Sequence, residues 1–123
     1  MSDFLIVIPA RYKSKRLPGK PLIDIKGLPM IVRTYNQCKK VVNSSKILVA
    51  TDHKKIFKLC KKNNINVMMT SSKCLTGTDR VAEASTKIKS KIYINVQGDE
   101  PTINPKDIKS VIKAKIKNPY HVI

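Results

Sequence analysis

Residues 4–22 of the chain read FLIVIPARYKSKRLPGKPL, and this stretch decides the fold. Its first part, 4–8, is apolar and rich in β-branched residues, the pattern of a strand buried on both faces of a parallel sheet. A loop follows at once, among whose prolines and single glycine stand Arg11, Lys13, Lys15, Arg16 and Lys20. A hydrophobic strand that ends in a cationic, turn-rich loop is typical of α/β proteins that bind phosphate at the carboxyl edge of a sheet.

The same loop has a second interpretation. A stretch rich in lysine and arginine is often only a solvated surface segment. It is also not a P-loop, because the earlier glycine of that motif is missing and Pro21 stands where a serine or threonine would follow the lysine. The prediction of a phosphate site therefore needs support from the rest of the chain.

After this loop, apolar runs alternate with amphipathic segments. Residues 22–25 suit a short extended piece that Gly27 ends, and Pro29 can be the first residue of a helix. Thr51-Asp52, Thr78 and Asn104-Pro105 are expected to begin three further helices. The buried faces of the four helices are expected to be Met30, Ile31, Thr34, Cys38 and Val41, then Ile56, Leu59 and Cys60, then Val81, Ala84 and Ile88, and finally Ile108, Val111, Ile112 and Ile116.

Strands are expected between these helices, at 46–50, 65–69, 92–96 and 120–123. Such an alternation of strands and helices predicts an α/β fold, with a mostly parallel sheet between two layers of helices (a three-layer α/β/α arrangement). Because the chain stops within the last expected strand, we expect it to be one domain that is incomplete at its C-terminus.

Composition excludes some classes of protein. The 123 residues are 41% apolar, which suits a single domain or a piece of one. They contain neither a long apolar run nor a signal-peptide pattern, so we expect a cytoplasmic protein with no membrane contact. The three cysteines are odd in number and lie far apart, without zinc or redox spacing, and we expect them to be reduced and mostly buried.

The net charge of +17 comes from 25 basic and 8 acidic residues and would attract polyanions. Most of the basic residues are lysines that are scattered over the expected helix faces. Aromatic residues are only 5%, and no recognised nucleic-acid-binding motif is present. A solvated lysine surface accounts for most of the charge, and a basic nucleic-acid-binding module stays as an alternative.

Three loops are expected to gather at one edge of the sheet, and two of them carry opposite charges. The basic loop follows the first strand, and an acidic loop, Gln97-Gly-Asp-Glu-Pro101, follows the fourth. If these strands are neighbours where the strand order reverses, Arg11, Lys20 and Asp99 face one crevice. The cations would hold a phosphate chain, and the carboxylate would hold Mg²⁺ against the same phosphates. The acidic loop can also be an ordinary turn.

A third candidate is Thr76-Gly-Thr-Asp-Arg80, which places hydroxyl groups and a glycine at a helix N-terminus, a combination that suits an anion. Thr78 and Asp79 can equally be ordinary helix caps. Asp52 is interpreted as a cap rather than a ligand, and His53 and His121 as structural.

These segments together resemble the 3-deoxy-manno-octulosonate (Kdo) cytidylyltransferase family. The resemblance covers nearly the whole chain, in the right order, and the complete acidic loop and the proline before Ala10-Arg11 favour this family over related nucleotidyltransferases. It is carried by Ile8-Pro-Ala-Arg-Tyr-Lys-Ser-Lys-Arg-Leu-Pro-Gly-Lys-Pro-Leu22, Asp24-Ile-Lys-Gly-Leu-Pro-Met-Ile-Val32, Val49-Ala-Thr-Asp-His53, Thr76-Gly-Thr-Asp-Arg-Val-Ala-Glu83 and Asn95-Val-Gln-Gly-Asp-Glu-Pro101.

The resemblance implies a Rossmann-like nucleotidyltransferase fold, of which residues 1–123 would be the N-terminal, CTP-binding part. It implies that CTP and Kdo give CMP-Kdo and pyrophosphate with Mg²⁺, in a cytoplasmic homodimer that serves lipopolysaccharide biosynthesis. In the family pattern, Arg11 and Lys20 match the residues that hold the CTP phosphates and Asp99 matches the magnesium ligand. The other matches are Arg16 to a further basic residue, Gln97 to a residue facing the sugar, Thr78 and Arg80 to the border of the nucleotide site, and Pro9 and Ala10 to the backbone beside the cytosine.

The chain departs from the family pattern at two points. Lys73-Cys74-Leu75 stands where the family carries a histidine segment, and the family is about twice as long. The absent half would supply a second metal-binding aspartate, more of the sugar pocket and most of the dimer interface. A relative acting on another acidic sugar and a remnant that binds nucleotide without turnover are therefore kept as alternatives.

Overall fold

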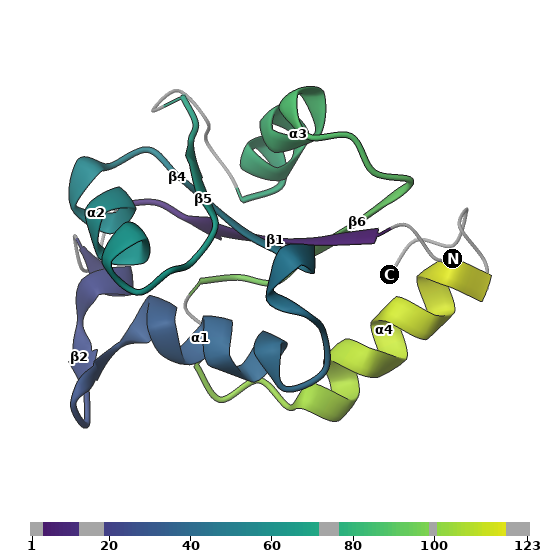
Figure 1. The fold of residues 1–123 in the computed structure, drawn as a ribbon, viewed down its shortest axis with the longest axis horizontal. Coiled ribbons are helices and arrows are strands. Elements are labelled where there is room, and N and C mark those ends of the chain that lie inside the picture. Colours follow the sequence, from purple (N-terminus) through teal and green to yellow (C-terminus); the bar gives the residue numbers. More distant parts are fainter. Residues whose placement is uncertain (1–3, 13–18, 72–76, 99–100, 118–123) are drawn as a thin grey trace.

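The computed structural model describes residues 4–12, 19–71, 77–98 and 101–117, with residues 77, 78, 116 and 117 described by their backbone. Four helices, α1 (Met30–Lys39), α2 (Lys54–Lys62), α3 (Gly77–Lys87) and α4 (Pro105–Lys117), alternate with strands (Figure 1). The main sheet consists of β1 (Phe4–Ala10), β4 (Ile47–Thr51), β5 (Val67–Met69) and β6 (Ile92–Asn95). Short elements are η1 (Lys20–Leu22), η2 (Ser44–Lys46), β2 (Asp24–Ile25) and β3 (Leu28–Pro29).

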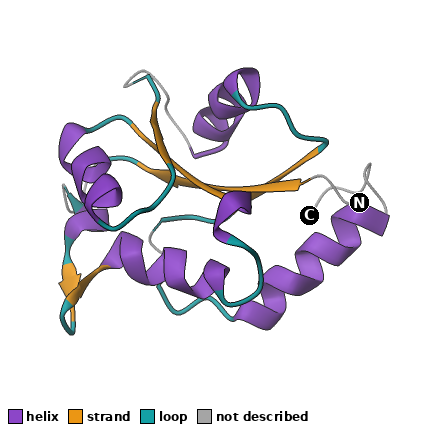
Figure 2. Ribbon diagram, viewed as in Figure 1, coloured by secondary structure: helices purple, strands orange, loops and turns teal. Residues whose placement is uncertain are grey.

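The main sheet has the order β5-β4-β1-β6, and all of its described pairs are parallel. Helices cover both of its faces, so that the strands form the middle layer of three (Figure 2). This confirms the predicted α/β fold. The strand expected at 120–123 lies outside the described residues.

The central strand β1 is buried on both faces, as its continuous apolar sequence predicts. Ile6, Ile8 and Ala10 join a core with buried residues of α1, α2 and α4. Leu5 and Val7 point to the opposite face, where they join a smaller core with Ala84 of α3. Figure 1 shows α3 on one side of the sheet and α1 and α4 on the other. The alternation of side chains along one strand thus divides the helices between the two faces.

The structure corrects several expected helix and strand ends. The cap of α2 is His53, whose Nδ1 accepts a hydrogen bond from the backbone N–H of Lys55 (3.1 Å), rather than Thr51-Asp52. Helix α3 begins at Gly77, one residue before the expected cap Thr78, and Ile88 lies beyond its end, 39% exposed, rather than on its buried face. Pro29 precedes α1, which starts at Met30, and β5 begins at Val67 rather than Ile65.

The largest difference from the expected pattern is a hairpin. Residues 24–29 form two antiparallel strands joined by a turn at Lys26 (φ 50°) and Gly27 (φ 95°). Positive φ at both central residues is the geometry of a type I′ turn, which suits glycine at the second position but is uncommon for lysine. The Arg33 side chain of α1 donates to the backbone oxygens of Ile25 (2.6 Å) and Lys26 (2.9 Å) and so stabilises the turn.

Replacement of Asn104 tests the one predicted helix start that is confirmed. Its Oδ1 accepts a hydrogen bond from the N–H of Lys106 (2.9 Å) ahead of Pro105, the first residue of α4. Asn104→Ala should lower the free energy of unfolding by about 1 kcal/mol, because a helix N–H loses its partner. Urea unfolding measures this change. The matched control is Asn36→Ala at an exposed position within α1, which should be neutral or slightly stabilising because alanine favours helix. Equal losses in both variants would contradict the capping role.

The buried thiols make a second prediction. Cys38 and Cys60 are buried and form no disulfide, and burial raises the pKa of Cys60 to about 12. Both should resist iodoacetamide at pH 8 in the native protein and react in urea, as peptide mass spectrometry can show, since the thiolate is the reactive form. Because the folded state keeps the Cys60 proton, this group should lower stability as pH rises from 9 towards 12. Rapid native labelling of Cys60 would contradict its burial.

Candidate functional site

The candidate site lies where the strand order reverses. The first strand, β1, pairs with β4 on one side and with β6 on the other, so the chain starts at the centre of the sheet and builds outward in both directions. The loops that follow β1 and β6 therefore leave neighbouring carboxyl ends, which is where parallel sheets bind ligands. This confirms the adjacency on which the combination of basic and acidic loops depends.

A close contact between Tyr12 and Gly19 closes the basic loop. The N–H of Gly19 donates to the backbone oxygen of Tyr12 at 2.6 Å. Gly19 has φ 74°, and a Cβ at this position would lie 3.1 Å from the Tyr12 ring. Only glycine meets both conditions without strain. We call the hydrogen-bonded pair Tyr12 and Gly19 the neck of the loop.

The neck brings two predicted site residues together. Arg11 and Lys20 are the residues next to it on its outer sides, Arg11 exposed and Lys20 half-buried in the first turn of η1. Because Tyr12 and Gly19 are hydrogen-bonded, Arg11 and Lys20 occupy adjoining backbone positions, and two neighbouring cations suit the binding of a polyanion. Arg16 lies outside the described residues.

Pro9 and Ala10 form the buried floor beside the neck. The backbone oxygen of Pro9 accepts a hydrogen bond from the N–H of Gly98 (3.2 Å), which joins the end of β1 to the start of the acidic loop. Pro9 lies opposite Ala50 in the pairing of β1 with β4, whereas the pairing of β1 with β6 ends at Val7. A Cβ at Gly98 would lie 3.0 Å from the Pro9 oxygen and 3.3 Å from the Cβ of Ala10, so a side chain there would force the two loops apart.

Helix α1 supports the acidic loop. The buried Thr34 hydroxyl lies 3.2 Å from the backbone oxygens of both Gly98 and Met30, and the Gln37 side chain donates to the oxygen of Ile103 (2.8 Å). Gln97 is exposed, with its Nε2 bonded to Oδ1 of Asn95 (3.2 Å). Asp99, the predicted metal ligand, lies outside the described residues. In the part of the chain that is described, no three His, Cys, Asp or Glu side chains gather into a group that could hold a metal ion.

Arg80 is placed differently from the other predicted residues. Its side chain is 1% exposed, and Nη1 donates to the Thr70 hydroxyl (2.5 Å) and to the backbone oxygen of Ser71 (3.2 Å). Nη2 lies 3.7 Å from Oδ2 of Asp52. The interactions of Arg80 in this structure are thus with protein groups, and direct contact with a nucleotide stays a prediction. Thr78 occupies the second position of α3, and its side chain is not described.

The sequence predicts a cap at Asp52 and a structural role for His53, and the structure gives both residues contacts with the neck. Asp52 Oδ1 accepts a hydrogen bond from the N–H of Tyr12 (3.3 Å). The His53 ring stacks on the Tyr12 ring, with centroids 3.9 Å apart and planes inclined by 19°, and Lys55 Nζ lies 5.8 Å from the centroid of the same ring. The sequence signals for these contacts are weak: residues 52 and 53 follow a buried strand beside β1, and they belong to a segment that shares the family resemblance.

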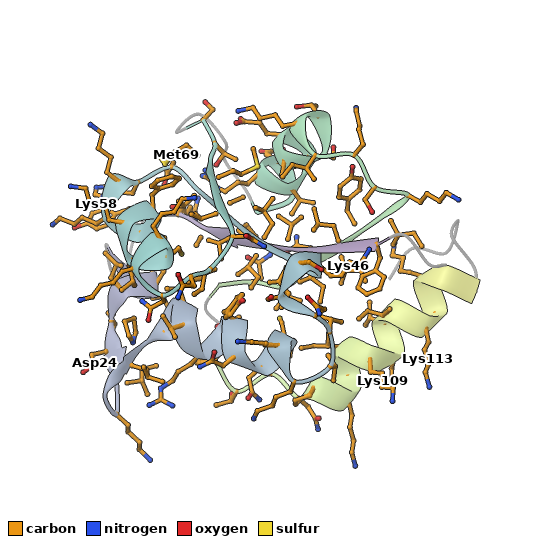
Figure 3. All side chains as sticks on the ribbon, viewed as in Figure 1. Asp24, Lys46, Lys58, Met69, Lys109 and Lys113 are labelled. Carbon is orange, nitrogen blue, oxygen red and sulfur yellow. The ribbon has the colours of Figure 1, made fainter. Side chains whose placement is uncertain are left out.

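The lysines are spread around the molecule, as the sequence predicts. Figure 3 shows Lys58 on α2 and Lys109 and Lys113 on α4 pointing outward from different sides. This distribution favours a general solvated surface over a single nucleic-acid-binding stripe. Among the described helices, none combines the length and the apolar character that crossing a membrane requires.

The sequence matches known cytidylyltransferases. A 3-deoxy-manno-octulosonate cytidylyltransferase from Escherichia coli is 42% identical over 119 residues, covering 97% of this chain and 48% of the relative. One from Neisseria meningitidis serogroup B is 45% identical over 121 residues, covering 96% and 47%. The chain thus spans about half the length of the curated relatives it matches.

Solved structures agree with this similarity. A CMP:2-keto-3-deoxy-manno-octonic acid synthetase complexed with CTP aligns with a TM-score of 0.91 at 41% identity, over 97% of this chain and 49% of that one. A cytidylyltransferase from Leptospira borgpetersenii shares the fold, with a TM-score of 0.78 at 23% identity, over 98% and 51% of the two chains. The model of the cytidylyltransferase family matches residues 5–122, and the chain therefore belongs to this family.

Proposed function

We propose that residues 1–123 are the CTP-binding part of a single nucleotidyltransferase domain, in an enzyme that joins CTP and Kdo into CMP-Kdo and pyrophosphate. The observation that carries the proposal is the pair Arg11 and Lys20, held on either side of the neck at the reversal point of the sheet. It is supported by the relatives of 42% and 45% identity, whose names give this activity, and by the similar structure that binds CTP. The product would serve lipopolysaccharide assembly, and we place the enzyme in the cytoplasm, where CTP is made.

In the proposed reaction the anomeric hydroxyl of Kdo attacks the α-phosphorus of CTP in line. An oxygen–phosphorus bond forms to the sugar, the bond from the α-phosphorus to the bridging oxygen breaks, and pyrophosphate leaves with that oxygen while the hydroxyl proton passes to solvent. Negative charge grows on the leaving group and the equatorial oxygens. Arg11 and Lys20 are suited to stabilise it, because fixed cations need no reorganisation during the reaction.

We propose roles for the other site residues from their positions in the structure and in the family pattern. The backbone at Pro9 and Ala10 forms a closed floor that would lie against the cytosine, and exposed Gln97 would contact the sugar. Arg16 and Thr78 are proposed to border the phosphates and the nucleotide.

A divalent cation, Mg²⁺ in our proposal, would neutralise part of the phosphate charge when bound. The described residues contain no complete set of metal ligands. Asp99 from this chain, together with the part of the protein outside this chain, would hold it. That remaining part would also provide most of a homodimer interface.

The activity is tested with the full-length protein, Kdo, a divalent cation and each nucleoside triphosphate in turn. We expect pyrophosphate release with CTP and little with the other nucleotides. Asp99→Ala should abolish it, because the proposed divalent cation would lose its ligand from this chain. Release with no nucleotide would overturn the proposal, and equal release with another acidic sugar would favour the related enzyme over the Kdo enzyme.

Removal of Lys20 tests whether a cation next to the neck contributes to the reaction with CTP. Lys20→Ala in the full-length enzyme should lower kcat/KM for CTP by about 10²- to 10³-fold, the usual cost of losing one preorganised charge-stabilising group. The matched control is Lys58→Ala on the exposed face of α2, which should leave kcat/KM unchanged. Steady-state kinetics of pyrophosphate release measure both. Similar losses in the two variants would mean that general positive charge, rather than position, attracts CTP.

A further inference from the structure

Arg80 is a buried arginine that lies next to the cationic loop but does not belong to it. Arg80 reaches from α3 to the carboxyl ends of the neighbouring strands β4 and β5. It forms an ion pair there with Asp52, which follows β4 (3.7 Å), and donates hydrogen bonds to Thr70 and Ser71, which follow β5. The Arg80 side chain is 1% exposed and that of Asp52 11% exposed. The positive charge of Arg80 and the negative charge of Asp52 nearly cancel, so the pair adds little attraction for an anion. Any contribution to CTP binding must therefore come from how the pair positions the basic loop.

The second oxygen of Asp52 extends this geometry to the basic loop. While Oδ2 faces Arg80, Oδ1 accepts the backbone N–H of Tyr12. A carboxylate fixed by a buried guanidinium has little freedom to rotate, so it holds that amide in one place. Tyr12 in turn accepts the N–H of Gly19, and this bond brings Arg11 and Lys20 to the two sides of the neck.

We propose that Arg80 and Asp52 are positioning residues for the triphosphate: the buried guanidinium orients Asp52, and Asp52 holds the neck that sets the separation of Arg11 and Lys20. This inference rests on the proposed function for the identity of the ligand, but the contacts that carry it are independent of any ligand. It assigns to Arg80 a role behind the loop instead of the direct nucleotide contact that its motif suggests.

The test uses the full-length protein with Arg80→Met, Asp52→Ala and the double variant. Hydrogen exchange of the peptide covering residues 9–22, followed by mass spectrometry without ligand, reports whether the Tyr12 and Gly19 amides are still held. Steady-state kinetics give the KM for CTP and for Kdo separately. Each single variant should speed exchange in this peptide and raise the KM for CTP about tenfold, as loss of one charge-assisted hydrogen bond would, with the KM for Kdo unchanged.

The double variant separates positioning from direct contact. If Arg80 acts through Asp52, the double variant should be no worse than the poorer single variant, because both break the same linkage. Multiplied losses, or a raised KM for CTP in Arg80→Met with exchange of residues 9–22 unchanged, would show that Arg80 contacts the nucleotide itself and would overturn the proposal. An unchanged KM for CTP in all variants would overturn it as well.

Two further variants control for a general loss of folding. Asp52→Asn keeps the shape and one acceptor oxygen, so it should give an intermediate KM for CTP and intermediate exchange. If Arg80→Met or Asp52→Ala does not fold, this isosteric variant carries the test, and wild-type behaviour in both readouts would overturn the proposal. Glu83→Gln is the matched control, because Glu83 also lies on α3, accepts from the N–H of Ser71 and forms an ion pair with Lys87, both away from the neck in sequence. It should leave the KM for CTP unchanged.

The same measurements distinguish a failure of the proposed function from a failure of the positioning role. In that case the wild-type protein would release no pyrophosphate from CTP, while exchange in residues 9–22 would still respond to Asp52→Ala. Normal wild-type activity with no response of this peptide would leave the proposed function intact and remove only the positioning role.

Discussion

The pairing of β1 on both sides is the constraint on which the rest of the structure depends. Because β1 lies between β4 and β6, its carboxyl end adjoins the ends of both, and the loop at 9–21 can be held from two directions. Asp52, after β4, holds the N–H of Tyr12, and Gly98, after β6, donates to the oxygen of Pro9. The same strand order that forms the core therefore also provides the hydrogen bonds that hold the start of the cationic loop.

The fold could be predicted from sequence because its determinants are local. A continuous apolar run such as 4–8 can be buried on both faces only in a covered parallel sheet. The cap and proline at Asn104-Pro105 begin α4 as expected, because a capping side chain needs only its own helix N–H groups as partners. The clustering of the basic loop with the acidic loop follows from strand order, which the alternation of elements restricts to few arrangements.

What the sequence could not predict depends on contacts between distant segments. Asp52 has the residue type and position of a helix cap, yet its partners are Tyr12, forty positions earlier, and Arg80. His53 takes the capping role instead, since its Nδ1 reaches the N–H of Lys55. The hairpin at 24–29 needs positive φ at Lys26, which local propensity disfavours and which Arg33 stabilises from α1. In each case a tertiary partner overrides the local preference.

The most direct measurement is a crystal structure of the full-length protein with CTP and without Kdo. We expect the triphosphate at the carboxyl ends of β1 and β6, with phosphate oxygens within hydrogen-bond distance of Arg11 and Lys20. We also expect Arg80 to remain buried against Asp52, on the far side of the neck. A triphosphate bound elsewhere on the molecule, or bound by Arg80 after separation from Asp52, would contradict this expectation.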